Sequence, residues 1–177
     1  QTMSERNNAI EDARGHARGI IDNITLEQTK IIDNTHRFLS RLSQTPLLLD
    51  QSSPKCSQYL ANLLNLSDAY LNIGAPNADG QLLCNAIPLT KSINVSDRLY
   101  LQKAMLERKF TVSQFQRDRS AEHISINFAY PIIRSDNEQV VGAVVAVVSL
   151  DWWSKQLQHT KLPNNAVAYI TDSGGEI

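Results

Sequence analysis

Apolar side chains recur at helical spacing through the first forty or so residues. They are Ile10, Ala13, Ala17, Ile20, Ile24, Ile31, Phe38 and Leu42, and no proline occurs before Pro46. This narrow stripe predicts one long amphipathic helix over residues 1–44. At 1.5 Å per residue such a helix spans roughly 60 Å, which is longer than a small domain needs for its own core. The helix therefore either packs along its own domain or also makes dimer contacts and transmits a signal.

From about residue 53 the pattern changes to shorter runs. Ser53 and Pro54 form a helix start, with the serine as cap and the proline in the first turn. Alternating or β-branched runs between polar turns then predict strands. The five predicted strands cover residues 69–73, 81–86, 110–116, 123–130 and 140–148. The last run is apolar throughout, which suits a central strand that is covered on both faces.

Polar links set the expected pairing of these strands. Residues 117–122 lack a long apolar side chain, so the strands on either side of them are expected to pair as an antiparallel hairpin. Arg117 and Arg119 fit a solvated hairpin tip better than an anion site. Pro131 is expected to limit the strand before it, because proline cannot donate to the hydrogen-bond ladder.

Two further helices and one further strand complete the expected elements. A short helix is expected to open at Asp97, whose side chain would cap it, and a last helix is expected to be capped by Asp151. Residues 162–165 break the pattern, and residues 166–171 predict a strand that is followed by a turn.

Composition and motifs exclude several classes of function. A length of 177 residues, with 42% hydrophobic and 20% charged residues, suits one well-buried globular core with an appendage. A net charge of -1 gives no reason to expect nucleic acid as a partner. No apolar run approaches the roughly 20 residues that a membrane helix needs. The histidines are scattered and no catalytic or phosphate-binding motif occurs, so we expect no enzyme activity, metal or cofactor.

The order of several short motifs resembles the Cache family of bacterial sensor domains, in particular the double-Cache type. The motifs are Cys56, Asn77-Ala78-Asp79-Gly80, Cys84, Ser96-Asp97-Arg98-Leu99-Tyr100, Phe128-Ala129-Tyr130-Pro131, Gly142 and Ser149-Leu150-Asp151. The resemblance covers most of the chain from about Ser53. It implies an α+β fold in which the long helix precedes a PAS-like, five-stranded antiparallel sheet flanked by helices.

The resemblance also implies a domain organisation and a location. Residues 1–44 would be a signalling and dimerisation helix, residues 45–164 a membrane-distal sensor module, and residues 165–177 the start of a second, truncated module. The module would lie in the periplasm, as part of an inner-membrane receptor such as a diguanylate cyclase, a sensor kinase or a chemoreceptor. The membrane segments would lie outside this fragment.

Cys56 and Cys84 are the only cysteines and fall on adjacent predicted elements. A periplasmic location permits a disulfide, and the resemblance supports this pairing. The alternative is a pair of buried free thiols.

The resemblance implies a small-molecule pocket on one face of the sheet. Arg98 is the first candidate contact, because its planar fork of donors suits a carboxylate; the alternative is an internal ion pair with Asp97 or Asp151. Tyr100 could pack on the ligand or fill the core. Further candidates, each of which could equally be a core residue, are Tyr70, Asn72, Phe115, Asn127 and Tyr130.

One departure from the amino-acid-sensing members of the family narrows the ligand class. Counting back from Asp151 places Val147 where those members carry an aspartate. Because valine cannot hold an ammonium group, the sequence favours a carboxylate or another small anion over a free α-amino acid. Two hypotheses follow: a sensor domain that binds a small molecule and dimerises through its long helix, or a ligand-free periplasmic interaction module.

Overall fold

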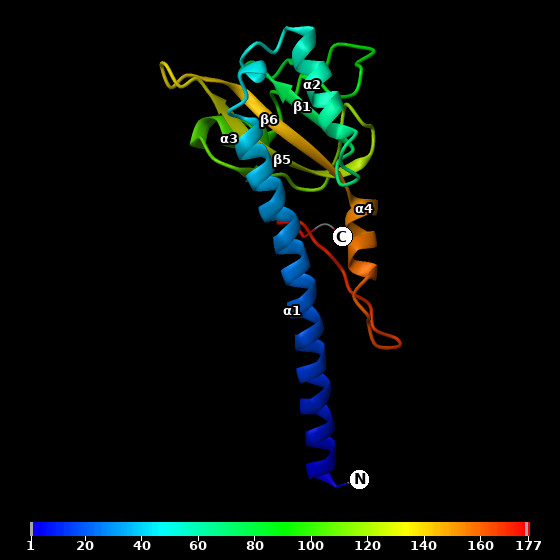
Figure 1. The fold of residues 1–177 in the computed structure, drawn as a ribbon. Coiled ribbons are helices and arrows are strands. Elements are labelled where there is room, and N and C mark those ends of the chain that lie inside the picture. Colours follow the sequence, from blue (N-terminus) through cyan, green and yellow to red (C-terminus); the bar gives the residue numbers. More distant parts are fainter. Residues whose placement is uncertain (1, 176) are drawn as a thin grey trace.

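The computed structural model describes residues 2–175 and 177. Its longest element is α1 (Met3–Leu42), whose N-terminal part extends well beyond the rest of the molecule (Figure 1). Thr2 caps the helix in a capping box with Glu5. Residues 2–19 are exposed, and the buried residues of α1 lie only in its last turns. The prediction of one long helix is therefore confirmed, and only its C-terminal end belongs to the core.

A single antiparallel sheet forms the centre of the molecule, with the strand order β2-β1-β6-β5-β3. A further short strand, β4, also pairs with β5. The strands are β1 (Asn72–Pro76), β2 (Leu82–Asn85), β3 (Thr111–Val112), β4 (Gln116–Arg117), β5 (Ile124–Ile133) and β6 (Val140–Ser149). The predicted five-stranded α+β fold is confirmed, with the third predicted strand divided into β3 and β4.

Alternation along β6 divides the core into two layers. Val144, Ala146 and Val148 pack on the side of α1 and α2 (Pro54–Leu64), where Phe128 and Trp153 also lie. Their neighbours Ala143, Val145 and Val147 face α3 (Leu99–Glu107) on the opposite side. Because both faces are covered, this strand can be apolar throughout, as the sequence predicts.

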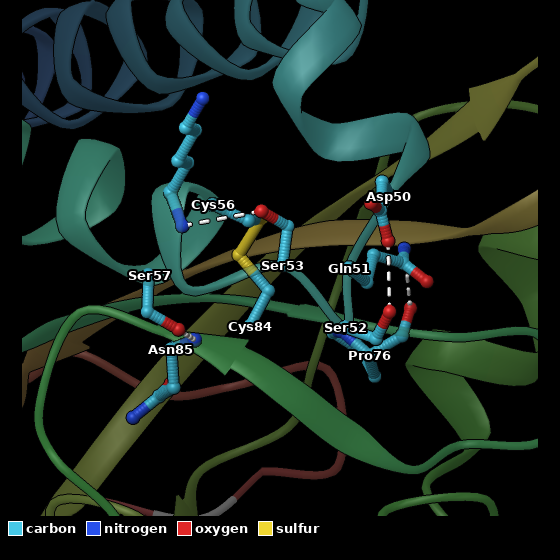
Figure 2. Close-up of a disulfide and its surroundings, with 10 residues drawn as sticks. Asp50, Gln51, Ser52, Ser53, Cys56, Ser57, Pro76, Cys84 and Asn85 are labelled. Carbon is cyan, nitrogen blue, oxygen red and sulfur yellow. Dashed lines mark hydrogen bonds between the residues drawn. A yellow bond between two sulfur atoms is a disulfide. The ribbon is translucent and has the colours of Figure 1, made fainter.

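The disulfide between Cys56 and Cys84 joins α2 to β2 (Figure 2). Both cysteines are fully buried, and the predicted pairing is confirmed. Ser53 caps α2 by accepting from the backbone N–H of Lys55, also as predicted. In the next turn the Ser57 hydroxyl accepts from the backbone N–H of Asn85, so α2 is held to β2 at two successive positions.

Two expectations about the strands are wrong in detail. Residues 113–115 belong to neither β3 nor β4. The Ser113 N–H still donates to the Asn127 carbonyl, but the Ser113 hydroxyl, in place of its carbonyl, accepts from the backbone N–H of Asn127, both at 2.8 Å. Pro131 does not end β5, which continues to Ile133. Beyond Ala129 the pairing of β5 is with β6 alone, so a residue without an N–H is tolerated on the unpaired side.

Two predicted helix caps are also wrong. The residue that precedes α3 is Arg98, and its side chain makes no capping hydrogen bond. The Asp97 carboxylate instead pairs with Arg119. At α4 (Leu150–Gln158) the cap is Ser149, which accepts from the N–H of Trp152, and Asp151 lies in the first turn. In both cases the cap lies one or two residues away from the expected carboxylate.

The segment after α4 forms no strand at residues 166–171, contrary to expectation. A strand needs a partner for its backbone, and none of the described strands pairs with this segment. Side-chain contacts hold it instead. Ile170 packs against the core, and the Asp172 carboxylate accepts from the backbone N–H of Phe115 at 2.8 Å.

Candidate functional site

A small cavity whose lining includes several buried polar side chains lies on the α3 side of the sheet. Its volume is about 20 Å³, enough for about one water molecule. Strands β1, β2 and β6 form its floor, and the loops at residues 93–95 and 118–120 cover it. The lining residues are Asn72, Gly74, Pro76, Leu82, Asn85, Ile93, Val95, Tyr100, Asp118, Arg119, Ser120, Val145 and Val147.

A row of side chains crosses β1, β6 and β5 on this face of the sheet, and its members on β1 and β6 line the cavity. In the sheet register Asn72 and Asn127 both lie opposite Val147, one on each side of it. Both asparagines are 1% exposed. Val147, the position compared above with an aspartate of amino-acid-sensing domains, therefore lies in the cavity floor, where its apolar side chain separates two buried amides.

Asn72 connects the floor to the covering loop. Its Nδ2 donates to Asn85 Oδ1 at 2.8 Å and to Ser120 Oγ at 2.7 Å, while its Oδ1 accepts from the backbone N–H of Ile87 at 3.3 Å. Gly74 lies beside this network, where an added Cβ would come within 2.7 Å of Asn85 Oδ1. The glycine therefore leaves room for the amide of Asn85.

Asn127 connects a second set of groups. Its Nδ2 donates to the Tyr100 hydroxyl at 3.2 Å and to Asp118 Oδ1 at 3.0 Å, and its Oδ1 accepts from Ser125 Oγ at 2.7 Å. Burial raises the pKa of the Tyr100 phenol above its ordinary value, so that hydroxyl stays protonated at neutral pH.

Asp118 is 7% exposed and organises the covering loop. Its Oδ2 accepts from the N–H and the hydroxyl of Ser120 and from the N–H of Ala121, at 2.5 to 2.9 Å. Hydrogen bonds from both sides thus hold this carboxylate in place. The loop presents Ser120 to the cavity as a result.

Outside the loop lies an open depression of about 530 Å³, which we call the vestibule. It is lined by Lys91, Ser92, Ile93, Asn94, Arg98, Arg117, Asp118, Arg119 and Glu122. Ile93, Asp118 and Arg119 line both the vestibule and the inner cavity, so they separate the two.

Arg119 makes the closest ion pair of this region. Its Nη1 and Nη2 donate to the two carboxylate oxygens of Asp97 at 2.6 and 2.7 Å, and Nη1 also donates to the backbone carbonyl of Asn94 at 2.8 Å. The hydrogen bond from Arg119 lowers the pKa of the Asp97 carboxyl to about 2. Arg119 is exposed in the loop before β5, as expected of a solvated tip, but its guanidinium is bound to Asp97 and Asn94.

The predicted contact residues fall into three groups. Asn72 and Tyr100 line the inner cavity, and Asn127 binds two of its lining side chains. Arg98 lies at the vestibule instead, where it donates to Gln116 Oε1 at 3.3 Å and to the carbonyl of Arg117 at 3.0 Å. Neither of the ion pairs considered for it forms among the described residues.

Tyr70, Phe115 and Tyr130 lie away from the cavity and pack against the core layer on the side of α1. Strand parity explains one of them: Tyr130 has the opposite parity to Asn127 on β5, so its side chain points to the other face. The other two lie outside the regular strands.

The sequence analysis missed Asn85, Asp118, Arg119 and Ser120. The last three belong to a polar link that was interpreted only as a hairpin turn. The spacing of Asp118 and Ser120 is that of a side chain that accepts from the backbone two residues on, and this was the available signal. In the described part of the chain, no group of three or more His, Cys, Asp or Glu side chains is placed to hold a metal.

The chain was compared with known proteins at the level of sequence and of structure. No protein-family model and no curated protein matches it. Three solved structures resemble it with a TM-score of 0.69 each. They are the sensor domain of the histidine kinase DctB from Vibrio cholerae, the ligand-binding domain of the chemoreceptor Tlp3 from Campylobacter jejuni with L-valine, and that of the amino acid chemoreceptor PctC from Pseudomonas aeruginosa with GABA.

The sequence identities to these three are 14%, 10% and 13%, and 84%, 90% and 82% of this chain is covered. The chain spans 60% of the DctB domain, 69% of the Tlp3 domain and 68% of the PctC domain. The predicted Cache, PAS-like fold is confirmed by this likeness. All three neighbours are sensor or ligand-binding domains rather than catalytic domains. None of the described helices is both long enough and apolar enough to cross a bilayer.

Proposed function

We propose, from this fold and from the buried polar side chains around its cavity, that the chain is the membrane-distal ligand-binding module of a bacterial transmembrane receptor. The module would lie in the periplasm, bind a small polar molecule in the cavity beside Tyr100, and transmit binding through α1. Residues 45–164 would form the sensing unit, and residues 165–177 would begin a second module.

The burial of polar side chains around the cavity carries this proposal. Asn72, Asn85, Asn127 and Asp118 are each 7% exposed or less, although a buried polar group is costly unless it is hydrogen-bonded. An apolar core of the same shape would avoid that cost. A cluster of buried amides and a carboxylate that converge on one cavity is typical of a binding site.

Binding requires movement of the covering loops. The inner cavity holds about one water molecule, whereas the vestibule outside it is more than twenty times larger. A ligand that entered from the vestibule would separate the loop at residues 118–120 from Asn72. Its polar groups would then replace Ser120 as the partner of the Asn72 amide.

A short path leads from the cavity to α1. Two residues before Asn72, the Tyr70 hydroxyl bonds to Thr35 Oγ1 of α1 at 3.1 Å, and its ring stacks on Phe38 at 5.3 Å. The backbone N–H of Leu71 donates to the carbonyl of Val147 on the cavity floor. A shift of β1 on ligand binding would therefore act directly on the long helix.

The test is a ligand screen by thermal shift, followed by calorimetry on two variants. Small carboxylates, amino acids and amines would be screened against the wild-type chain. For any ligand found, Asn72→Ala should weaken binding by about tenfold, because one hydrogen bond to a buried amide is lost. Asn8→Ala, the same change on the exposed part of α1, is the control and should bind like the wild type. Equal affinities of the two variants would exclude this cavity as the site.

Two observations favour a second candidate function, a ligand-free dimerisation module. The Asn72 amide, the Asn127 amide and the Asp118 carboxylate are all satisfied by neighbouring groups. The projecting part of α1 also exposes Ile10, Ile21 and Leu26. A screen without any hit, together with dimers in sedimentation, would support this candidate.

A further inference from the structure

The vestibule is positively charged on a chain whose net charge is -1. Four of its lining residues are cationic: Lys91, Arg98, Arg117 and Arg119. Its two acidic residues differ in their surroundings. Asp118 is buried and accepts hydrogen bonds from neighbouring donors, whereas Glu122 is exposed. The lining therefore carries a formal excess of two positive charges, or of one when Asp97, the partner of Arg119, is counted, and an excess of positive charge at the mouth of a cavity attracts anions.

Arg119 is the cation that stands between the vestibule and the inner cavity. The end of its guanidinium forms a bidentate pair with the Asp97 carboxylate, the geometry in which arginine recognises any carboxylate or phosphate. Arg119 belongs to the covering loop at residues 118–120, and Asp97 lies 22 positions earlier, two residues beyond the covering loop at residues 93–95. The pair therefore fastens those segments to each other.

The ion pair between Arg119 and Asp97 is weak enough for another carboxylate to replace that of Asp97. The side chain of Arg119 is 38% exposed and that of Asp97 is 64% exposed. Ion pairs at such sites contribute little to stability, because water and salt screen them. A carboxylate from a ligand can replace the carboxylate of Asp97 at little net cost, since the donor fork keeps an equivalent partner.

We propose that Arg119 anchors an anionic ligand, and that the Asp97 carboxylate occupies its donor fork until a ligand carboxylate or phosphate displaces it. The inference rests on the proposed function, since the ligand then reaches the inner cavity. Displacement of Asp97 removes the ion pair between the loop at residues 118–120 and the segment before α3, and leaves the bond from Arg119 to the Asn94 carbonyl as the remaining contact of this side chain with that segment. Anion recognition and loosening of the two segments are thus one event, and a neutral ligand would have to break the pair without replacing it.

The test uses the whole chain with three probes at constant ionic strength: succinate, inorganic phosphate and, as a neutral control, succinamide. Asp97→Asn removes the internal competitor and should raise the affinity for succinate or phosphate about twofold to fivefold, as expected for an exposed pair. Glu122→Gln changes the net charge equally, but among the described residues Glu122 forms no ion pair with Arg119, so its effect should be smaller. Arg119→Gln should lower the affinity for the anion at least about tenfold. In the double variant it should also abolish the gain in affinity that Asp97→Asn gives.

Several results would overturn the proposal. The first is an equal gain in anion affinity from Glu122→Gln and Asp97→Asn. The second is an anion affinity that Asp97→Asn leaves unchanged or lowers. The third is that neither anion binds the wild type or Asp97→Asn at tens of millimolar. Arg119→Lys keeps the charge without the fork, and far-ultraviolet circular dichroism would establish that it and Arg119→Gln are folded. Preference for succinate over phosphate, or the reverse, identifies the ligand group.

Nuclear magnetic resonance separates failure of this inference from failure of the proposed function. If the anions shift the Arg119 Nε–H signal but not the side-chain amide signals of Asn72 and Asn127, they bind only outside, and the proposed use of the inner cavity is wrong. If a neutral molecule shifts the two amide signals and Asp97→Asn does not alter its affinity, the cavity is a site but the exchange at Arg119 is wrong.

Discussion

Removal of the disulfide between Cys56 and Cys84 should destabilise the protein without changing its fold. The bridge closes a chain segment with a sequence separation of 28 residues. In the chain-entropy model a loop of this length restricts the unfolded state by about 3 to 4 kcal/mol. For a domain of this size the corresponding fall in Tm is roughly 6 to 16 °C.

The assay is urea unfolding followed by circular dichroism, for the oxidised wild type, the wild type refolded under reductant, and Cys56→Ala/Cys84→Ala. Both cysteines are fully buried, so the double variant also loses the packing of two sulfur atoms and should be the least stable. The reduced wild type keeps these atoms and isolates the effect of the bond. Its m-value should rise, since an unfolded chain without a cross-link exposes more surface.

The double variant with and without reductant is the control, because it has no thiol to respond. A loss below about 1 kcal/mol on reduction of the wild type, with an unchanged m-value, would refute the entropic argument. In that case packing between α2 and β2, rather than the covalent bond, would account for the stability of this corner of the sheet.

Three further predictions concern a titration and the long helix. The pKa of the Asp97 carboxyl lies at about 2 in the folded protein, below its ordinary value of 3.8, so the small stabilisation from its ion pair should be present above about pH 4 and lost as the pH falls through about 2. Urea unfolding across this pH range would measure it, and Asp97→Asn should remove that component. Tyr70→Phe deletes the hydrogen bond to Thr35 and should lower the unfolding free energy by about 0.5 to 1.5 kcal/mol in the same assay. An unchanged unfolding free energy would mean that this contact does not couple the cavity to the helix. The third prediction is that exposed Ile10 and Ile21 support a homodimer through α1. Changing both residues to Glu should reduce dimerisation in sedimentation equilibrium and leave Tm unchanged. A wild type that is monomeric at millimolar concentration would contradict this prediction.

The sequence alone determined the elements that rest on local pattern. The period of the apolar residues predicted the helix that became α1, and the unbroken apolar run predicted that β6 would lie at the centre of the sheet. The cap at Ser53 was also predictable, because a helix start depends on a few neighbouring residues. The disulfide was supported by the family resemblance.

Only the tertiary structure decided which polar residues meet at the cavity. Arg119 and Asp97 lie 22 positions apart, and Asn72 meets Ser120 across 48, so their contacts depend on how the loops fold over the sheet. Local pattern shows that a loop is polar but not which distant group its side chains reach. The same reason explains why the expected cap at Asp97 was wrong: a partner from another loop bound the carboxylate that the helix start would otherwise have used.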